Sequence, residues 1–232
     1  MSKNALKSYI HLPPGAPSGD VVRDFLALIF KKFKWFTPAR YGDADLAESI
    51  TPDKLDALHV YYEEHDNLCV AARTDRDFIW ILPCKSGADP YHGQISWVTS
   101  AASASKASWR AAHVDQVGEL MRLFQSPLAT SALASDVESK CWRWVQDGIG
   151  ETLTPNVRGY GEGLAGLFWR NFFGPPYVRM FGQRLDALPT ECRKPLGEDI
   201  VLVQPYELPT EAGTEAGMAR ERELISLLGS EC

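Results

Sequence analysis

Two glutamates and an arginine are the residues whose types and positions could do acid–base chemistry. Glu151 and Glu162 flank the apolar stretch 163–182, GLAGLFWRNFFGPPYVRMFG, which has Arg170 near its centre. A pair of carboxylates beside a guanidinium could bind a substrate and transfer a proton if the three side chains lined one cleft. One hypothesis is therefore an enzyme of unknown class, with its pocket beside an expected strand over residues 164–172.

The other reactive residue types lack the spacing of a metal site or of a nucleophile with its base. No histidine has a second His or a Cys at a standard zinc spacing. The sequence has no GxSxG motif, and the glycines between positions 159 and 166 lack the GK[ST] ending of a phosphate loop. His113 falls on the apolar face of an expected helix, where we expect a hydrogen-bonded core histidine. These patterns favour a protein without metal, cofactor or catalytic residues.

The net charge of −6 and the pI of about 5.4 bear on the class of partner. A nucleic-acid binder needs a basic patch to meet phosphates, so the charge balance argues against one. An acidic surface suits a basic protein partner, although plain solubility explains the same charge. The five cysteines are widely spaced and odd in number, which favours reduced thiols. Because no signal-peptide run and no span of about 18 apolar residues is present, we expect a cytoplasmic protein without membrane contact.

Hydrophobic periodicity predicts helices first and strands next in the N-terminal half. Ser18 or Asp20 can cap the first helix, and Pro52 suits the first turn of the second. Residues 1–18 could form a flexible arm or a leading strand. The expected elements are a helix from Val21 to about Phe33, a helix over 52–64, a β-hairpin of 68–73 with 78–83, and a third strand over 94–99.

The C-terminal half alternates helices and buried strands. We expect an antiparallel pair of helices around Ser126-Pro127, with the second helix carrying Leu128 to Val145. The expected elements are helices over 109–124 and 128–145, strands over 153–157 and 164–172, a helix from Pro175, a strand over 200–204, and a helix over 214–228 with Met218 facing inward. This order predicts a single α+β domain over residues 1–232, with a mostly antiparallel sheet and helices packed outside it.

An acidic surface with a tryptophan anchor is the candidate partner-binding site. Trp142 and Trp144 stand two apart on an expected helix, so both cannot face one core, and an exposed tryptophan is typical of an interface anchor. A tryptophan that covers a loop is the alternative. The acidic candidates are Asp43, Asp45, Glu48, Asp53, Glu63, Glu64 and Asp66.

Three C-terminal segments carry a resemblance to a known family. The order WRNFFGPPYV, then IVLVQPYELP, then ARERELISLLG resembles the immunity protein 52 family of bacterial polymorphic toxin systems, over roughly residues 160–232. The N-terminal half shares the general character of that family, with an amphipathic helix, FTPARYG, an acidic loop and TPD. The resemblance implies that one group of residues is scaffold: Trp169, Arg170, Asn171, Phe172, Phe173, Gly174, Pro175 and Pro176. It assigns no toxin-contacting residue.

The resemblance implies an α+β protein made in the toxin-producing cell. It would bind the C-terminal domain of a cognate toxin, delivered by a type VI or related secretion machine, and block its active site by stoichiometric occlusion. The acidic surface would then meet a basic toxin. The enzyme hypothesis above and an adaptor protein of a secretion apparatus are the alternatives.

Overall fold

The computed structural model describes residues 4–74, 76–84, 93–146, 148, 150–155, 164–197 and 199–229. These residues contain twelve strands and six α-helices. The strands are β1 (Ala5–His11), β2 (Arg40–Gly42), β3 (Glu48–Ser49), β4 (Leu68–Ala71), β5 (Phe78–Leu82), β6 (Gln94–Ser100), β7 (Leu128–Leu133), β8 (Trp142–Gln146), β9 (Glu151–Pro155), β10 (Arg170–Phe173), β11 (Arg193–Pro195) and β12 (Val201–Val203). The helices are α1 (Gly19–Ala27), α2 (Asp56–His65), α3 (Ala107–Leu123), α4 (Ala134–Cys141), α5 (Pro175–Phe181) and α6 (Glu215–Leu228).

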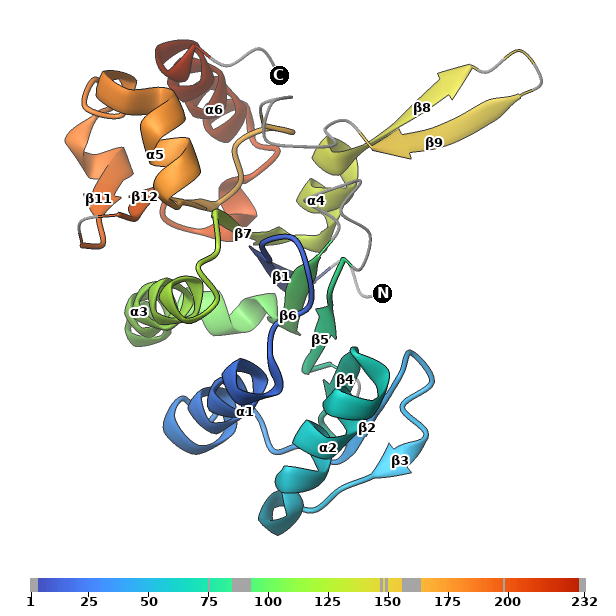
Figure 1. Ribbon diagram of the computed structural model, residues 1–232. Coiled ribbons are helices and arrows are strands. Elements are labelled where there is room, and N and C mark those ends of the chain that lie inside the picture. Colours follow the sequence, from blue (N-terminus) through green and yellow to red (C-terminus); the bar gives the residue numbers. More distant parts are fainter. Residues whose placement is uncertain are drawn as a thin grey trace.

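One antiparallel sheet organises the molecule (Figure 1). Its ten strands run in the order β11-β12-β10-β7-β1-β6-β5-β4-β2-β3, and each neighbouring pair among these described strands is antiparallel. β1 lies in the middle, between β6 and β7, so the N-terminal segment holds the centre of the sheet. β8 and β9 form a separate hairpin that projects away from the sheet. The predicted α+β class with a mostly antiparallel sheet is confirmed.

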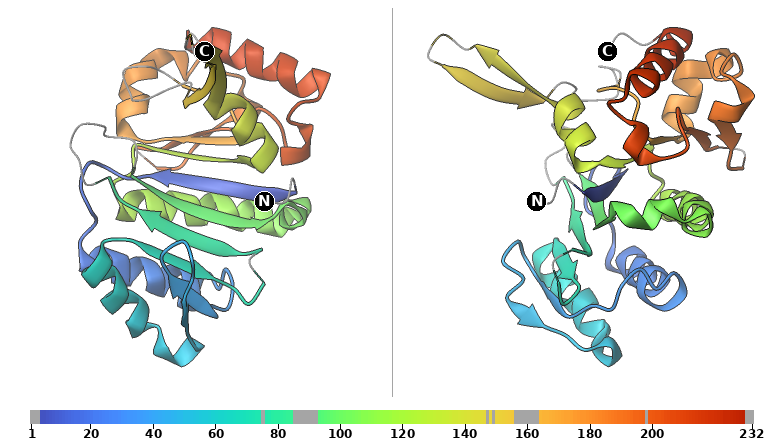
Figure 2. Two further views of the ribbon diagram at one scale, coloured as in Figure 1. Left: turned by 90° about the vertical axis from the view of Figure 1, so that its right-hand side faces the viewer. Right: turned by 180° about the vertical axis from the view of Figure 1, so that it is seen from behind.

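Helices cover both faces of this sheet. α1, α2 and α3 share one hydrophobic core with β4, β5 and β6, whereas α5 and α6 pack in a second core. Figures 1 and 2 place α5 and α6 at the β11–β12 end of the sheet, and α1 and α2 at the opposite end. β10 joins the two cores, because Phe172 belongs to the first and Phe173 to the second. None of the helices that the structure describes has the length and apolar character needed to cross a bilayer.

Side-chain caps fix several predicted helix ends. Ser18 Oγ accepts the Val21 amide at 3.5 Å before α1, and Thr214 Oγ1 accepts the Gly217 amide at 3.1 Å before α6. Gly229 ends α6 with φ +59°, a conformation that glycine adopts at low cost. The inward orientation predicted for Met218 is wrong, since 42% of its surface is exposed. Leu224 and Leu228 fill that face instead.

The helix predicted over 128–145 is wrong, and so is the predicted pair of antiparallel helices. The segment divides into β7, the short helix α4 and β8. Residues 128–132 of β7 are buried, and β7 pairs with β1 on one side and with β10 on the other. Ala129 and Ala132 are small side chains in this buried strand. The spacing of Leu128, Leu133 and Val137 fits a helix, but pairing on both sides of β7 outweighs this local preference.

The strand predicted over 164–172 is shorter and shifted. Only Arg170–Phe173 pairs in the sheet, although it is interior and buried on both faces as expected. Upstream, Asn171 satisfies the backbone in place of a strand partner: its Oδ1 accepts the Phe168 amide at 3.0 Å, and its Nδ2 donates to the Phe168 carbonyl at 2.9 Å. The Asn171 side chain therefore satisfies the backbone N–H and carbonyl of Phe168, upstream of the paired residues.

Candidate functional site

His113 on α3 is the centre of a buried hydrogen-bond network. Its Nε2 lies 3.0 Å from Ser8 Oγ on β1 and 3.3 Å from Ser131 Oγ on β7. Arg170 Nη1 on β10 donates to His113 Nδ1 at 2.9 Å. Because a guanidinium only donates, Nδ1 must accept and the ring proton must sit on Nε2. The prediction of a hydrogen-bonded core histidine is confirmed.

Burial and charge together keep this histidine neutral. Removal of the ring from water lowers the pKa of His113 well below its usual value, and the Arg170 charge lowers it further. The serine–histidine contact looks like a nucleophile with its base, but the arrangement does not suit that chemistry. Nε2 carries the proton, so it has no lone pair for Ser8 or Ser131, and all three side chains are at most 3% exposed. The network joins α3 to the sheet.

Arg170 is held by neutral groups on three sides. Its Nε donates to Gln204 Oε1 at 3.0 Å and its Nη1 to the Arg110 carbonyl at 2.9 Å. The guanidinium also stacks 4.1 Å from the centre of the Trp169 ring. Burial, and then the charge of Arg110, lower the pKa of Arg170 to about 9. Arg170 thus ties down backbone, without a carboxylate among these partners.

Of the two glutamates proposed to act with Arg170, the structure describes Glu151, which does not lie beside Arg170. Glu151 is exposed on β9 in the projecting hairpin, where its Oε1 accepts from Gln146 Nε2 at 2.9 Å. Glu162 lies outside the described residues. Within the described residues, no three His, Cys, Asp or Glu side chains come together in a way that could hold a metal ion. The pocket beside Arg170 is lined instead by groups from α3, β11 and β12.

The seven predicted acidic residues are all exposed at the β2–β3 end of the molecule. Asp43 and Asp45 lie in the β2–β3 turn, and Glu48 begins β3. These three carboxylates lie near Tyr61 of α2. Burial raises the pKa of the Tyr61 phenol, and the charges of Asp43, Asp45 and Glu48 raise it further. The others are Asp53, Glu63, Glu64 and Asp66, which lie in or beside α2.

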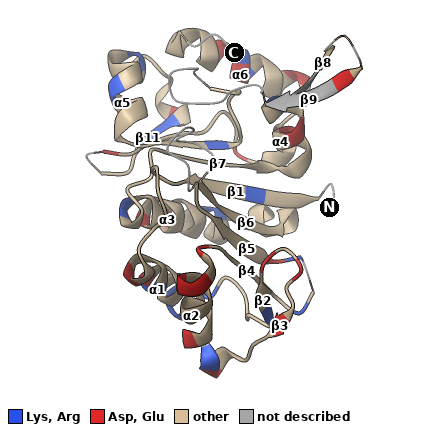
Figure 3. Cartoon of the chain, turned by 45° about the vertical axis from the view of Figure 1, so that its right-hand side comes forward, with Lys and Arg blue, Asp and Glu red and all other residues tan. Residues whose placement is uncertain are grey.

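This acidic end does not form one continuous face. Glu63 lies on the α1 side of α2, where its carboxylate meets Gly19 and stands 3.4 Å from His59 Nε2. Basic side chains also occur at this end: Arg40 on β2, and Lys54 before α2 (Figure 3). The candidate surface is therefore the cluster of Asp43, Asp45 and Glu48 around Tyr61, which we call the acidic cluster.

Trp142 and Trp144 lie on β8, so the predicted helix on which the argument for an exposed tryptophan rested is wrong. The β8–β9 hairpin lies at the α6 end in Figures 1 and 2, away from β2 and β3. The acidic residues and the strand that carries both tryptophans therefore do not share one face of the molecule. The tryptophan side chains themselves lie outside what the structure describes.

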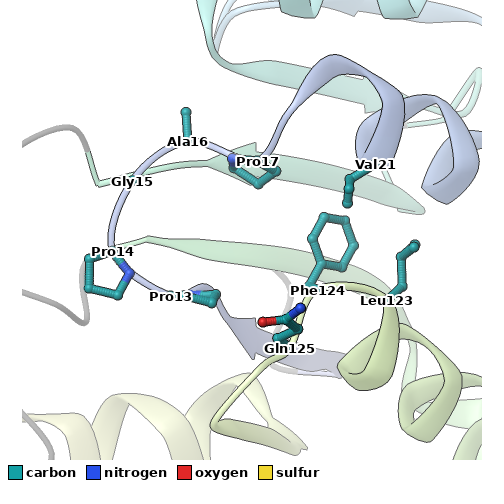
Figure 4. Close-up of a pocket in the computed structure, with 9 residues that line it drawn as sticks. All are labelled: Pro13, Pro14, Gly15, Ala16, Pro17, Val21, Leu123, Phe124 and Gln125. Carbon is teal, nitrogen blue, oxygen red and sulfur yellow. The ribbon is translucent and has the colours of Figure 1, made fainter.

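A second pocket, of about 170 Å³, opens at the C-terminal end of α3 (Figure 4). The 13–17 segment forms one wall, and Val21, Leu123 and Phe124 form the other. Gln125 supplies its polar side chain, and none of the lining residues is titratable. This pocket has the character of an apolar recess and lacks groups for acid–base or nucleophilic chemistry.

Sequence reasoning missed the partners that give Arg170 its setting. Ser8 on β1, Ser131 on β7 and Gln204 just after β12 are far apart in the chain, and single polar residues among apolar ones give no signal of a shared network. No sequence pattern indicated a role for Arg110 either, although it follows Trp109 on the predicted helix over 109–124.

Comparison with protein-family models gives no match for this chain, and comparison with curated proteins gives none either. The fold is that of an α+β protein built on one wide antiparallel sheet, and it is similar to a solved structure. That structure is the Pseudomonas aeruginosa T6SS protein PA0821, where T6SS denotes a type VI secretion system. The similarity has a TM-score of 0.58, covers 97% of this chain and 73% of that chain, and comes with 11% sequence identity. At that identity it shows a shared fold.

Proposed function

We propose that this chain is an immunity protein that binds and neutralises a cognate toxin of a type VI or related secretion system. The carrying observation is the fold similarity to a T6SS protein over 97% of the chain. The C-terminal segments point the same way, since WRNFFGPPYV resembles the immunity protein 52 family. The protein would act in the cytoplasm of the toxin-producing cell by stoichiometric occlusion of the toxin's active site.

The acidic cluster supports a basic partner. Asp43, Asp45 and Glu48 are exposed, and the whole chain has a net charge of −6. Clustered carboxylates raise the rate of encounter with a positively charged surface and favour one orientation of approach. Many toxins that act on nucleic acids present such a surface around the active site, so occlusion there would block substrate.

Binding is also favoured over catalysis by the chemistry of the described interior. The Ser8–His113 contact has its ring proton on Nε2, and Glu151 stands on the hairpin rather than beside Arg170. We therefore propose that the protein is not an enzyme. An adaptor role in the secretion apparatus is the alternative that the same fold similarity allows.

Co-expression with the product of the neighbouring toxin gene tests the proposal. We expect growth of a toxin-expressing host to be rescued and a tight 1:1 complex to appear by size-exclusion chromatography with light scattering. Absence of both rescue and binding would overturn the immunity role. A stable complex with a secretion-apparatus component, without rescue, would instead establish the adaptor role.

A further inference from the structure

An open pocket of about 260 Å³ lies beside Arg170, between α3 and the β11–β12 edge of the sheet. α3 supplies Arg110, Ala111 and Val114, and β12 supplies Leu202 and the neighbouring Gln204. Lys194 comes from β11, the outermost strand. Cationic groups therefore face an apolar floor, a combination that suits the charged end of a small organic molecule.

The charges of this pocket are unbalanced in an otherwise acidic protein. Its lining includes Arg110, Arg170, Arg193 and Lys194 against one carboxylate, that of Glu191. Glu191 is engaged by Arg220 at 2.6 Å, and Arg193 pairs with Asp186 outside the pocket lining. Arg110 pairs with Glu207, whose side chain is 72% exposed. Lys194 is exposed, and no ion pair of Lys194 is present within the described residues.

Arg170 is the buried cation of this pocket. The side chain is 3% exposed, yet its hydrogen-bond partners are the neutral Gln204 Oε1, the Arg110 carbonyl and His113 Nδ1. A buried charge without an opposite charge costs considerable free energy. These hydrogen bonds use Nε and Nη1 of the guanidinium and do not use Nη2. Arg170 lines the pocket.

We propose that this pocket binds a small anion through a carboxylate or phosphate group, with Arg170 and Lys194 as its cationic ligands. The Arg110 guanidinium is already engaged by Glu207 and by the Ala104 and Ser105 carbonyls. A guanidinium presents its N–H groups in a planar fork that matches both kinds of anion. The volume lies below the range typical of drug-sized ligands, so the anionic group itself and a short apolar tail would fill it. Val114 and Leu202 would contact that tail. The proposal does not depend on the immunity role.

The test is calorimetric titration at low ionic strength with two probes, inorganic phosphate and succinate. We expect single-site binding of at least one probe, weakened about threefold to tenfold by Lys194→Gln. Lys54→Gln, at the opposite end of the molecule, is the matched control and is expected to change nothing. The probe that binds more tightly identifies whether the site takes a tetrahedral or a planar anion.

Arg170→Lys tests the guanidinium fork, and we expect binding to fall about tenfold or more. If that variant unfolds, Lys194→Glu serves in its place, because Lys194 is exposed and its replacement leaves the core intact. The proposal is overturned if neither probe binds. It is equally overturned if Lys194→Gln and Lys54→Gln weaken binding to the same extent, which would indicate general screening of the surface charge.

Discussion

Two polar residues of β10, Arg170 and Asn171, and the carboxylates of the acidic cluster are used by the molecule in opposite ways. Arg170 and Asn171 are at most 3% exposed, and their side chains have fixed partners on β12, α3 or the preceding backbone. Asp43 and Asp45 are exposed in the turn between two short strands. Burial thus decides whether a polar residue defines the fold or stays available to a partner.

The two regions also differ in how much change they tolerate. A buried polar group must keep its hydrogen bonds, because leaving one unmade costs the desolvation of that group. An exposed carboxylate exchanges one water contact for another at little cost. Core motifs of this kind identify a fold, whereas a surface such as the acidic cluster is free to vary with its partner.

Phe172→Ala should produce the largest loss of stability. Phe172 is fully buried in the core shared with α3, so the substitution removes apolar burial and leaves a cavity. We expect the free energy of unfolding to fall by about 3–5 kcal/mol, measured by urea denaturation. Val60→Ala on α2 is the control, because Val60 is 51% exposed. An equal loss in both variants would erase the distinction between the two regions.

Gly174→Ala should have the next largest effect. A Cβ at this position would lie 2.5 Å from the Ser126 carbonyl and 2.9 Å from that of Pro127, and backbone cannot move aside as a flexible side chain can. We expect a loss of about 1–3 kcal/mol by the same measurement. Gly150→Ala is the matched control, since a Cβ there meets nothing within 4 Å. Retention of full stability in Gly174→Ala would contradict the close approach.

Local signals in the sequence predicted the parts of the fold that local physics controls. Ser18 and Thr214 cap helices as expected, and the apolar periodicity of residues 109–124 became α3. β7 was missed because its burial depends on β1 and β10, which are far away in the sequence. The shortened β10 was missed because the Asn171 side chain, and not a strand partner, satisfies the backbone of Phe168.

The candidate sites divide in the same way. The exposure of Asp43 and Asp45 follows from their place in a turn, and Glu48 directly follows that turn. The sequence led us to expect a pocket beside Arg170, but not its cationic lining, because Arg110, Arg170 and Lys194 come from separate elements of the chain. A cluster assembled by tertiary structure leaves no spacing pattern in one sequence.

The pH dependence of stability should report the buried network. The pKa of His113 is lowered by burial and by Arg170, so above the unfolded-state pKa of about 6.5 the residue is neutral in both states. Below that pH the unfolded chain gains a proton that the folded protein does not. The free energy of unfolding should therefore fall as pH decreases from about 6.5, by up to about 1.4 kcal/mol per pH unit, until the folded-state pKa is reached.

Comparison with variants isolates this contribution from those of the carboxylates. Subtraction of the His113→Asn curve from that of the original protein should leave the slope of one proton. His65→Asn is the control, because His65 is exposed on α2 and hydrogen-bonded to the Tyr61 carbonyl at 2.9 Å. If His113→Asn keeps the full slope of the original protein, His113 is not the group that is kept neutral by folding.

Charge reversal in the acidic cluster should affect stability least while affecting association most. Asp43→Lys, Asp45→Lys and Glu48→Lys are each expected to change the free energy of unfolding by no more than about 0.5 kcal/mol, because all three side chains are exposed. If the acidic cluster meets a basic toxin, the combined variant should associate about tenfold or more slowly at low salt, measured by stopped-flow mixing. Asp115→Lys on α3 changes the charge by the same amount as each single substitution and is the control for net charge. Equal slowing per substituted residue in both would mean that total charge, rather than the acidic cluster, directs the encounter.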